Sequence, residues 1–278
     1  PVQSTHHGAP VRVLYLGARA RIGVGHEDRA SGLVAEADGD RLSKQEMFGL
    51  CNFIFLAGHE TTANAMTFAI YLLGRHPAAL AQVEGELDHV LQGRAPTSSD
   101  YPKLKYLRNV MEETLRLFPP AWMVGRKNLV PLEIDGYQVK PGSILLAPQW
   151  LMHRDSRYFA SPDQFRPERW DEQTPEKGAY FPFGGGTRVC IGEGFARMEA
   201  VLILAALLQK YRPTLLSRQE LEVYAGITLR PKDGLKVRFT PRAQQKPSPR
   251  HNSTPRGEGL KYEAHSGCPI GAGRISGG

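Results

Sequence analysis

The sequence has little cysteine: Cys51, Cys190 and Cys268 are the three in its 278 residues, and no two of them form a CxxC pair. A disulfide framework is therefore not expected, and the pattern suits a reducing cytoplasm. The chain also has no uninterrupted run of the roughly 18 apolar residues that a membrane-spanning helix needs. Residues 1–25 do not resemble a signal peptide. We therefore expect a cytoplasmic protein with no membrane segment in this chain.

The sequence has no large excess of charge outside its C-terminal tail. The formal net charge is +7, and residues 241–278 carry six lysines and arginines against two glutamates, which is +4 of this total. The rest of the chain is therefore close to charge balance. Because a basic tail of this kind is usually a solvated segment, we predict that nucleic acid is not a partner.

The helical signals are strong over the first part of the chain. Ser43 and Glu46 have the spacing of a capping box, and Gly74 and Pro77 supply stop signals for the helix that begins there. Apolar periodicity and proline positions predict the other helices. The predicted helices are residues 43–75, 77–91, 104–118 and 192–211.

The later part of the chain changes to strand and turn signals. Asp135-Gly136 is a typical two-residue hairpin turn, and Lys232-Asp233-Gly234 predicts the turn of a last hairpin. Residues 153–183 are rich in proline, aspartate and aromatics without a sustained period, which indicates a compact meander. The predicted strands are residues 129–134, 137–139, 143–147, 221–229 and 235–239. The predicted fold class is therefore mainly α with small β-sheets.

The most informative segment is the glycine-rich loop FGGGTRVCIG at residues 183–192, which ends on Cys190 with a predicted helix directly after it. The partial positive charge of a helix N-terminus stabilises a thiolate. Glycines let the backbone lie flat against a large planar group, and Arg188 could pair with a carboxylate. The loop lacks the spacing of phosphate-binding loops, and no second cysteine or histidine stands at zinc-ligand spacing.

This loop matches the pattern F-x-x-G-x-R-x-C-x-G and resembles the haem-binding loop of the cytochrome P-450 family. Three other segments resemble motifs of that family in the same order: AGHETT at 57–62, E-x-x-R at 113–116 and P-E-R at 167–169. The resemblance implies a partial cytochrome P-450 fold. The predicted domains are an irregular N-terminal remnant at 1–40, a haem-binding domain at 41–242 and a disordered basic tail at 243–278.

The resemblance also implies a role for individual residues. Cys190 matches the axial ligand of the haem iron, while Thr61 and Glu60 match the catalytic pair that delivers protons. Thr61 can also bond the carbonyl group one helical turn earlier. The residues implied to contact haem b are Ala57, Gly58, Arg126, Phe183, Gly186, Arg188, Cys190 and Gly192. The residues implied to form a buried structural network behind the loop are Glu113, Arg116 and Arg169.

The function implied by the resemblance is a haem-thiolate monooxygenase that inserts one atom of dioxygen into a small hydrophobic organic substrate. Its electrons would come from NAD(P)H through a ferredoxin, a flavodoxin or a reductase. Only about 40 residues precede the oxygen-binding helix, where the family has a long stretch of helices. The alternative is therefore a truncated, catalytically inactive haem-binding remnant. Met123, Val124 and residues 227–229 are predicted to line what remains of a substrate pocket.

Overall fold

The computed structural model describes residues 42–172, 174–217 and 220–242 of the chain. The predictions for residues 1–40 lie outside the described residues. So do those for the tail at 243–278 and for Cys268 within it. The predicted domain boundaries therefore stay predictions.

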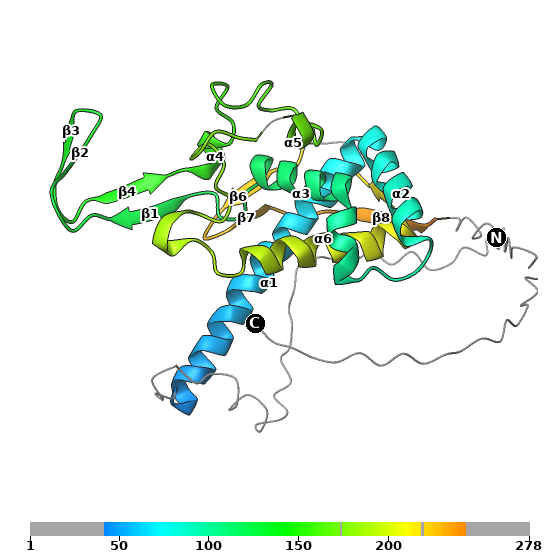
Figure 1. Ribbon diagram of the computed structural model, residues 1–278, viewed down its shortest axis with the longest axis horizontal. Coiled ribbons are helices and arrows are strands. Elements are labelled where there is room, and N and C mark those ends of the chain that lie inside the picture. Colours follow the sequence, from blue (N-terminus) through cyan, green and yellow to red (C-terminus); the bar gives the residue numbers. More distant parts are fainter. Residues whose placement is uncertain (1–41, 173, 218–219, 243–278) are drawn as a thin grey trace, which may run out of the picture. The chain divides into compact units, whose positions relative to one another are not determined.

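The described residues form a mainly helical body with short strands, which confirms the predicted fold class (Figure 1). The helices are α1 Lys44–Arg75, α2 Pro77–Leu91, α3 Lys105–Leu117, α4 Gln149–Met152, α5 Arg169–Glu172 and α6 Glu193–Lys210, with 3-10 helices η1 Ser98–Lys103 and η2 Gly186–Arg188. The strands are β1 Val124–Lys127, β2 Leu132–Ile134, β3 Tyr137–Val139, β4 Ile144–Ala147, β5 Tyr211–Leu215, β6 Val223–Ala225, β7 Leu229–Pro231 and β8 Val237–Pro241. Among the described residues, no helix is both long enough and apolar enough to cross a membrane.

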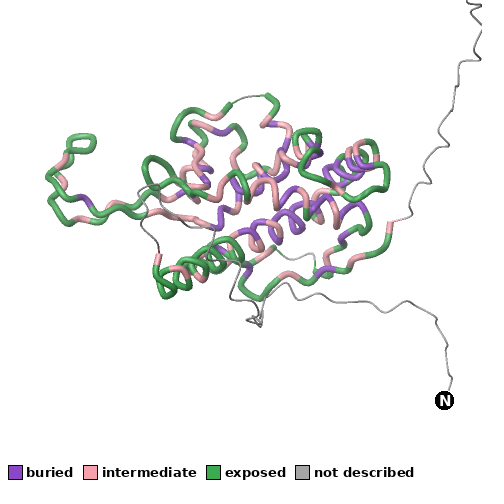
Figure 2. The backbone as a smooth tube through the Cα atoms, turned by 60° about the horizontal axis from the view of Figure 1, so that its bottom comes forward, coloured by how far each residue is buried: buried purple, intermediate pink, exposed green. Residues whose placement is uncertain are grey.

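Helix α1 begins as its sequence predicts. The backbone N–H of Ser43 donates to Oε2 of Glu46 at 2.8 Å, and the backbone N–H of Glu46 donates to Oγ of Ser43 at 3.3 Å, so the capping box is confirmed. Burial is restricted to the second half of the helix, where Thr62 is its first buried residue. The first half extends from the body and is largely exposed to solvent (Figure 2).

The core lies where the second half of α1 meets α2, α3 and α6 (Figure 2). Removing an aliphatic side chain completely from water contributes roughly 1.5–3 kcal/mol, so this leucine-rich cluster is the main source of stability in the body. The largest of its side chains with no exposed surface are Leu73, Leu87, Leu91, Leu104, Leu107, Leu204 and Leu208. Helix α6 crosses α1 within this core (Figure 1).

The strands form four antiparallel pairs: β1 with β4, β2 with β3, β5 with β8 and β6 with β7. The predicted hairpin around Asp135-Gly136 is confirmed, with φ of 47° at Asp135 and 81° at Gly136. Both angles lie in the left-handed region that the mirror-image two-residue turn requires. Strand β1, which was not predicted, pairs with β4 and places Arg126 opposite Leu145.

The predicted last hairpin is wrong in its pairing. Strand β6 turns back at Gly226 to pair with β7, while β8 pairs with β5, the strand that follows α6 directly. The Lys232-Asp233-Gly234 turn therefore joins two separate sheets instead of closing a hairpin. Strand β5 was missed because Pro213 and its polar neighbours lack a clear alternation, so Tyr211 was assigned to the preceding helix.

Gly74 lies where α1 packs against β5. A Cβ at this position would lie 2.7 Å from Cγ of Leu215, whereas a Cβ at Gly49 in the same helix would meet no atom within 4 Å. We expect Gly74→Ala to lower the free energy of unfolding by about 1–2 kcal/mol, because overpacking outweighs the helix-propensity gain. Gly49→Ala should instead raise it by up to about 1 kcal/mol. Urea unfolding of both variants tests this, and equal stabilisation by both would contradict it.

Candidate functional site

Cys190 lies at the end of a tightly folded loop and immediately before α6. Its backbone N–H donates to the carbonyl oxygen of Phe183 at 3.0 Å, which closes the loop on itself. Gly184 and Gly186 have φ of 76° and 69°, in the left-handed region where a side chain would be unfavourable. The thiol is exposed. The loop therefore presents one sulfur outward at the N-terminal end of a helix.

The surroundings of Cys190 are apolar and open. Val189, Ile191 and Phe195 expose 49%, 105% and 65% of their surface, an unusual cluster beside a polar loop. A Cβ at Gly185 or Gly186 would meet no atom within 4 Å. This combination leaves room for a flat apolar group beside the sulfur.

Two arginines assigned to this site have no carboxylate partner within the described ranges. Arg188 is exposed and makes no hydrogen bond or ion pair to a described residue. Arg126, on β1, is also exposed and donates through Nη1 to the carbonyl oxygen of its neighbour Gly125 at 2.9 Å. Both guanidinium groups are therefore available to an anionic ligand.

The predicted acid and alcohol on α1 have different partners. The hydroxyl of Thr61 donates to the carbonyl oxygen of Ala57 at 2.7 Å, which is the back-bond that the sequence allowed. Oε1 of Glu60 accepts a hydrogen bond from the hydroxyl of Thr228 at 2.7 Å. Asn64, one turn further along α1, also reaches Thr228, at 3.4 Å. The structure thus couples Glu60 to the β6–β7 hairpin and not to Thr61, a link that no local sequence signal indicates.

Ala57 and Gly58 lie on the exposed half of α1, and a Cβ at Gly58 would meet no atom within 4 Å. Since α6 crosses α1, the helix that follows Cys190 contacts the helix that carries the AGHETT segment (Figure 1). On the predicted pocket wall, Ile227 is fully exposed, while Met123 and Val124 are half-buried.

Glu113, Arg116 and Arg169 form one buried cluster, with 0%, 0% and 2% of their side chains exposed. Arg116 binds the carboxylate of Glu113 through Nε and Nη2, both at 2.9 Å. Nε of Arg169 donates to Oε1 of Glu113 at 3.0 Å. Glu113 also accepts hydrogen bonds from the backbone N–H of Arg166 at 2.9 Å and from Nε1 of Trp170 at 3.1 Å.

The remaining donors of the two arginines bind backbone carbonyl groups of the 153–164 segment. Arg116 donates to the carbonyl oxygens of His153 at 2.8 Å and Pro162 at 2.6 Å. Arg169 donates to that of Ala160 at 2.9 Å. The cluster therefore ties the irregular meander to α3, and none of its three charged side chains is exposed for chemistry.

His153 connects this meander to the chain that leads into the cysteine loop. It is fully buried, and its Nε2 accepts the backbone N–H of Phe181 at 3.0 Å. Gln149 holds the same residue from the other side, donating to the carbonyl oxygen of Phe181 at 3.1 Å. Burial lowers the pKa of His153 to about 3, so the ring is neutral in the folded protein at neutral pH.

The depressed pKa of His153 predicts a loss of stability in acid. As the pH falls below about 6.5, the unfolded chain binds a proton that the folded chain excludes, so stability decreases from pH 6 to pH 4 by about 1 kcal/mol per unit. His153→Gln, which keeps an acceptor for Phe181, should flatten this dependence. Urea unfolding across this pH range measures it, and parallel curves for the two proteins would contradict the assignment.

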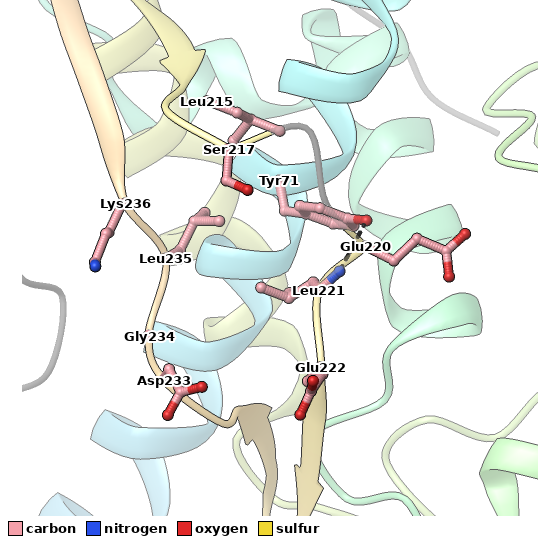
Figure 3. Close-up of a pocket in the computed structure, with 10 residues that line it drawn as sticks. All are labelled: Tyr71, Leu215, Ser217, Glu220, Leu221, Glu222, Asp233, Gly234, Leu235 and Lys236. Carbon is pink, nitrogen blue, oxygen red and sulfur yellow. Dashed lines mark hydrogen bonds between the residues drawn. The ribbon is translucent and has the colours of Figure 1, made fainter.

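Two cavities lie away from these residues. The smaller, of about 210 Å³, is bounded by Tyr71, whose hydroxyl accepts the backbone N–H of Leu221 at 3.4 Å (Figure 3). Leu235 lies beside them, while the amine of Lys236 points away (Figure 3). The larger, of about 570 Å³, is also lined by Tyr71 and extends to Arg154. None of the residues assigned to chemistry lines either cavity.

The donor set at Cys190 fits a group that takes a single protein ligand. Within the part of the chain that the structure describes, no three or more His, Cys, Asp and Glu side chains are arranged to hold a metal ion. The exposed sulfur, the open glycine backbone, the apolar neighbours and two available arginines suit a planar apolar cofactor that carries its own metal and carboxylates. The residues present therefore fit haem.

Comparison with known proteins agrees with this geometry. The family model described as cytochrome P-450 matches residues 27–238. Cyclooctatin synthase of Streptomyces melanosporofaciens is 44% identical over 191 residues, 66% of this chain and 42% of that protein. Cyclooctat-9-en-7-ol 5-monooxygenase of the same organism is 37% identical over 200 residues, 70% of this chain and 44% of that protein. This chain spans less than half the length of these relatives.

Solved structures show the same arrangement of elements. The heme domain of a mutant of cytochrome P-450DA superposes with a TM-score of 0.73 at 31% identity, covering 78% of this chain and 49% of that one. The unmutated P-450DA heme domain gives a TM-score of 0.71 at 32% identity, covering 76% and 48%.

Proposed function

The chain belongs to the cytochrome P-450 family, and from this premise we propose that it supplies the haem-thiolate half of a monooxygenase. The observation that carries the proposal is the exposed thiol of Cys190, which lies at the end of the FxxGxRxCxG loop and in front of α6. In this reading Cys190 is the axial ligand of the iron of haem b. Bound with a thiolate ligand, haem supplies the activation of dioxygen.

The other residues of the site hold the cofactor in place. Arg188 and Arg126 bind its carboxylates as charge-assisted hydrogen-bond donors, which is supported by their lack of carboxylate partners among the described residues. Phe183, Gly186 and Gly192 shape the loop beside it. Ala57 and Gly58 leave the surface of α1 low enough for a flat group to approach.

Proton supply is the role we propose for Glu60 and Thr61. Glu60 is exposed to solvent, and its carboxylate is oriented by the hydroxyl of Thr228. The hydroxyl of Thr61 donates its hydrogen bond to the carbonyl oxygen of Ala57. Rotation about its Cα–Cβ bond would turn that hydroxyl from the helix backbone toward the exposed face, where it can pass a proton on.

The proposed reaction inserts one atom of dioxygen into a small hydrophobic organic substrate. One relative is named for its action on cyclooctat-9-en-7-ol, so this alcohol is a reasonable first substrate to test. Electrons from NAD(P)H would arrive through a ferredoxin, a flavodoxin or a reductase, and the low cysteine content supports a cytoplasmic location.

A catalytically inactive haem-binding remnant is the second candidate. The observation that favours it is the exposure of apolar side chains on the first half of α1, such as Phe53 and Leu56, each 68% exposed. A substrate pocket built on these residues would be open to water. NAD(P)H consumption that depends on substrate and is coupled to product would exclude this candidate.

The test of the proposed function is the carbon monoxide difference spectrum of the reduced, haem-reconstituted chain. Thiolate ligation gives the red-shifted Soret band for which the family is named, and this result would support Cys190 as the ligand. A band at the ordinary haem-protein position, or failure to retain haem, would contradict the proposal.

A further inference from the structure

Arg197, in the second turn of α6, joins three segments around the cysteine loop. Its guanidinium carbon lies 4.8 Å from the centroid of the Phe183 ring, the first residue of the loop. Its Nη1 pairs with the carboxylate of Glu112 on α3. Its Nη2 and Nε donate to Oε1 of Glu193 at 3.1 and 3.3 Å. One side chain thus contacts the start of the loop, the start of α6 and α3.

Glu112 also contacts the segment that precedes the cysteine loop. The hydroxyl of Tyr180, three residues before Phe183, lies 2.8 Å from Oε2 of Glu112 and 3.0 Å from its carbonyl oxygen. Helix α3 therefore uses two adjacent glutamates differently. Glu113 binds the two buried arginines of the cluster. Glu112 binds Tyr180, which precedes the loop, and Arg197, which follows it.

Arg197 and Glu112 are less exposed to solvent than an ordinary surface pair. The side chains of Arg197 and Glu112 are 20% and 21% exposed, and burial lowers the pKa of Arg197 and raises that of Tyr180. In such a partly desolvated site, charge-assisted hydrogen bonds gain strength, and a guanidinium stacked on an aromatic ring adds a cation–π attraction.

We propose that Arg197 is a positioning residue that fixes the cysteine loop against α3 and so sets the place of the Cys190 sulfur. Only Phe183 stands between Arg197 and Cys190. The guanidinium group of Arg197 lies over the ring of Phe183, and the carbonyl oxygen of Phe183 accepts the backbone N–H of Cys190 at 3.0 Å. The importance of this position rests on the proposed function of Cys190 as iron ligand. The role of Arg197 in holding the loop does not.

Hydrogen exchange of the chain without haem tests the positioning role directly. In Arg197→Gln the amide of Cys190 should exchange about tenfold faster than in the unchanged protein, since the loop opens without global unfolding. The matched control is Arg212→Gln, which removes another Arg–Glu contact, between β5 and Glu84 of α2. In the control, exchange across residues 183–192 should be unchanged. Equal exchange of the loop in both variants would overturn the proposal.

The spectrum of the haem-loaded protein supplies a second readout. Arg197→Gln should shift at least about half of the carbon monoxide complex from the red-shifted band to the ordinary position, as expected when a residue that orients a ligand is lost, while Arg212→Gln should not. If Arg197→Gln fails to fold, Arg197→Lys keeps the charge but loses the planar stack, and faster exchange at Cys190 is again expected. Failure of the unchanged chain to bind haem would defeat the proposed function alone, because the exchange experiment needs no cofactor.

Discussion

A Cys190→Ser variant is expected to lose the red-shifted carbon monoxide band completely. A serine hydroxyl stays protonated at neutral pH and is a poor donor to iron compared with a cysteine thiolate. The substitution changes one exposed atom, so the fold should be retained. The measurement is the difference spectrum after haem reconstitution, with circular dichroism to compare helix content.

Cys51 provides the matched control for this experiment. It is also an exposed cysteine, but it lies in the first half of α1, outside the FxxGxRxCxG loop. Cys51→Ser should leave the spectrum unchanged. An unaltered red-shifted band in Cys190→Ser would show that another group ligates the iron.

Glu113→Gln is expected to lower the free energy of unfolding by roughly 3–5 kcal/mol, because removing one partner leaves buried charge uncompensated. In this protein the substitution leaves two buried charges without a counterion, because Arg116 and Arg169 both pair with the carboxylate of Glu113. The amide of glutamine would also turn one donor group toward these cations. Urea unfolding at neutral pH measures the effect.

The control for Glu113→Gln is Asp155→Asn, which weakens an ion pair of similar length at the surface. Nη2 of Arg157 lies 2.5 Å from Oδ2 of Asp155, but the arginine side chain is 72% exposed. Its loss should cost less than about 1 kcal/mol. Similar losses from the two substitutions would mean that the buried cluster contributes no more than a surface pair.

The four long helices α1, α2, α3 and α6 were predictable because their signals are local, whereas the four-residue helices α4 and α5 were not predicted. The capping box at Ser43, the glycine and prolines at helix ends and the apolar periodicity of α6 lie within the segments that they define. The pairing of β5 with β8 was not predictable, since the paired residues lie 22 to 30 positions apart and the turn signal at Asp233 suggested a nearer partner. Strand pairing of this kind depends on tertiary packing more than on propensity.

In the candidate site as well, residues in a local sequence pattern were predictable, while contacts between residues far apart in the sequence were not. The FxxGxRxCxG pattern singled out Cys190 and Arg188 without a structure, and the roles given to them stay predictions. The contact of Glu60 with Thr228 joins residues 168 positions apart. The role of Arg197 was equally hidden, because an arginine four residues after Glu193 on a helix reads as an ordinary surface pair. Only the fold shows that Phe183 and Glu112 lie against it.

In mechanical terms α1 is a cantilever, clamped in the body from Thr62 onward, with Glu60 bonded to Thr228 just before that point and the earlier described residues largely exposed. Lys44 at the start of the helix lies about 27 Å from the clamp at 1.5 Å per residue, so a tilt of the helix by about 5° would move Lys44 by about 2 Å. Ala57, about 7 Å from the clamp, would move by only about 0.6 Å. The segment proposed to face the cofactor therefore occupies the stiffest part of the projecting rod, where precise placement and exposure are compatible.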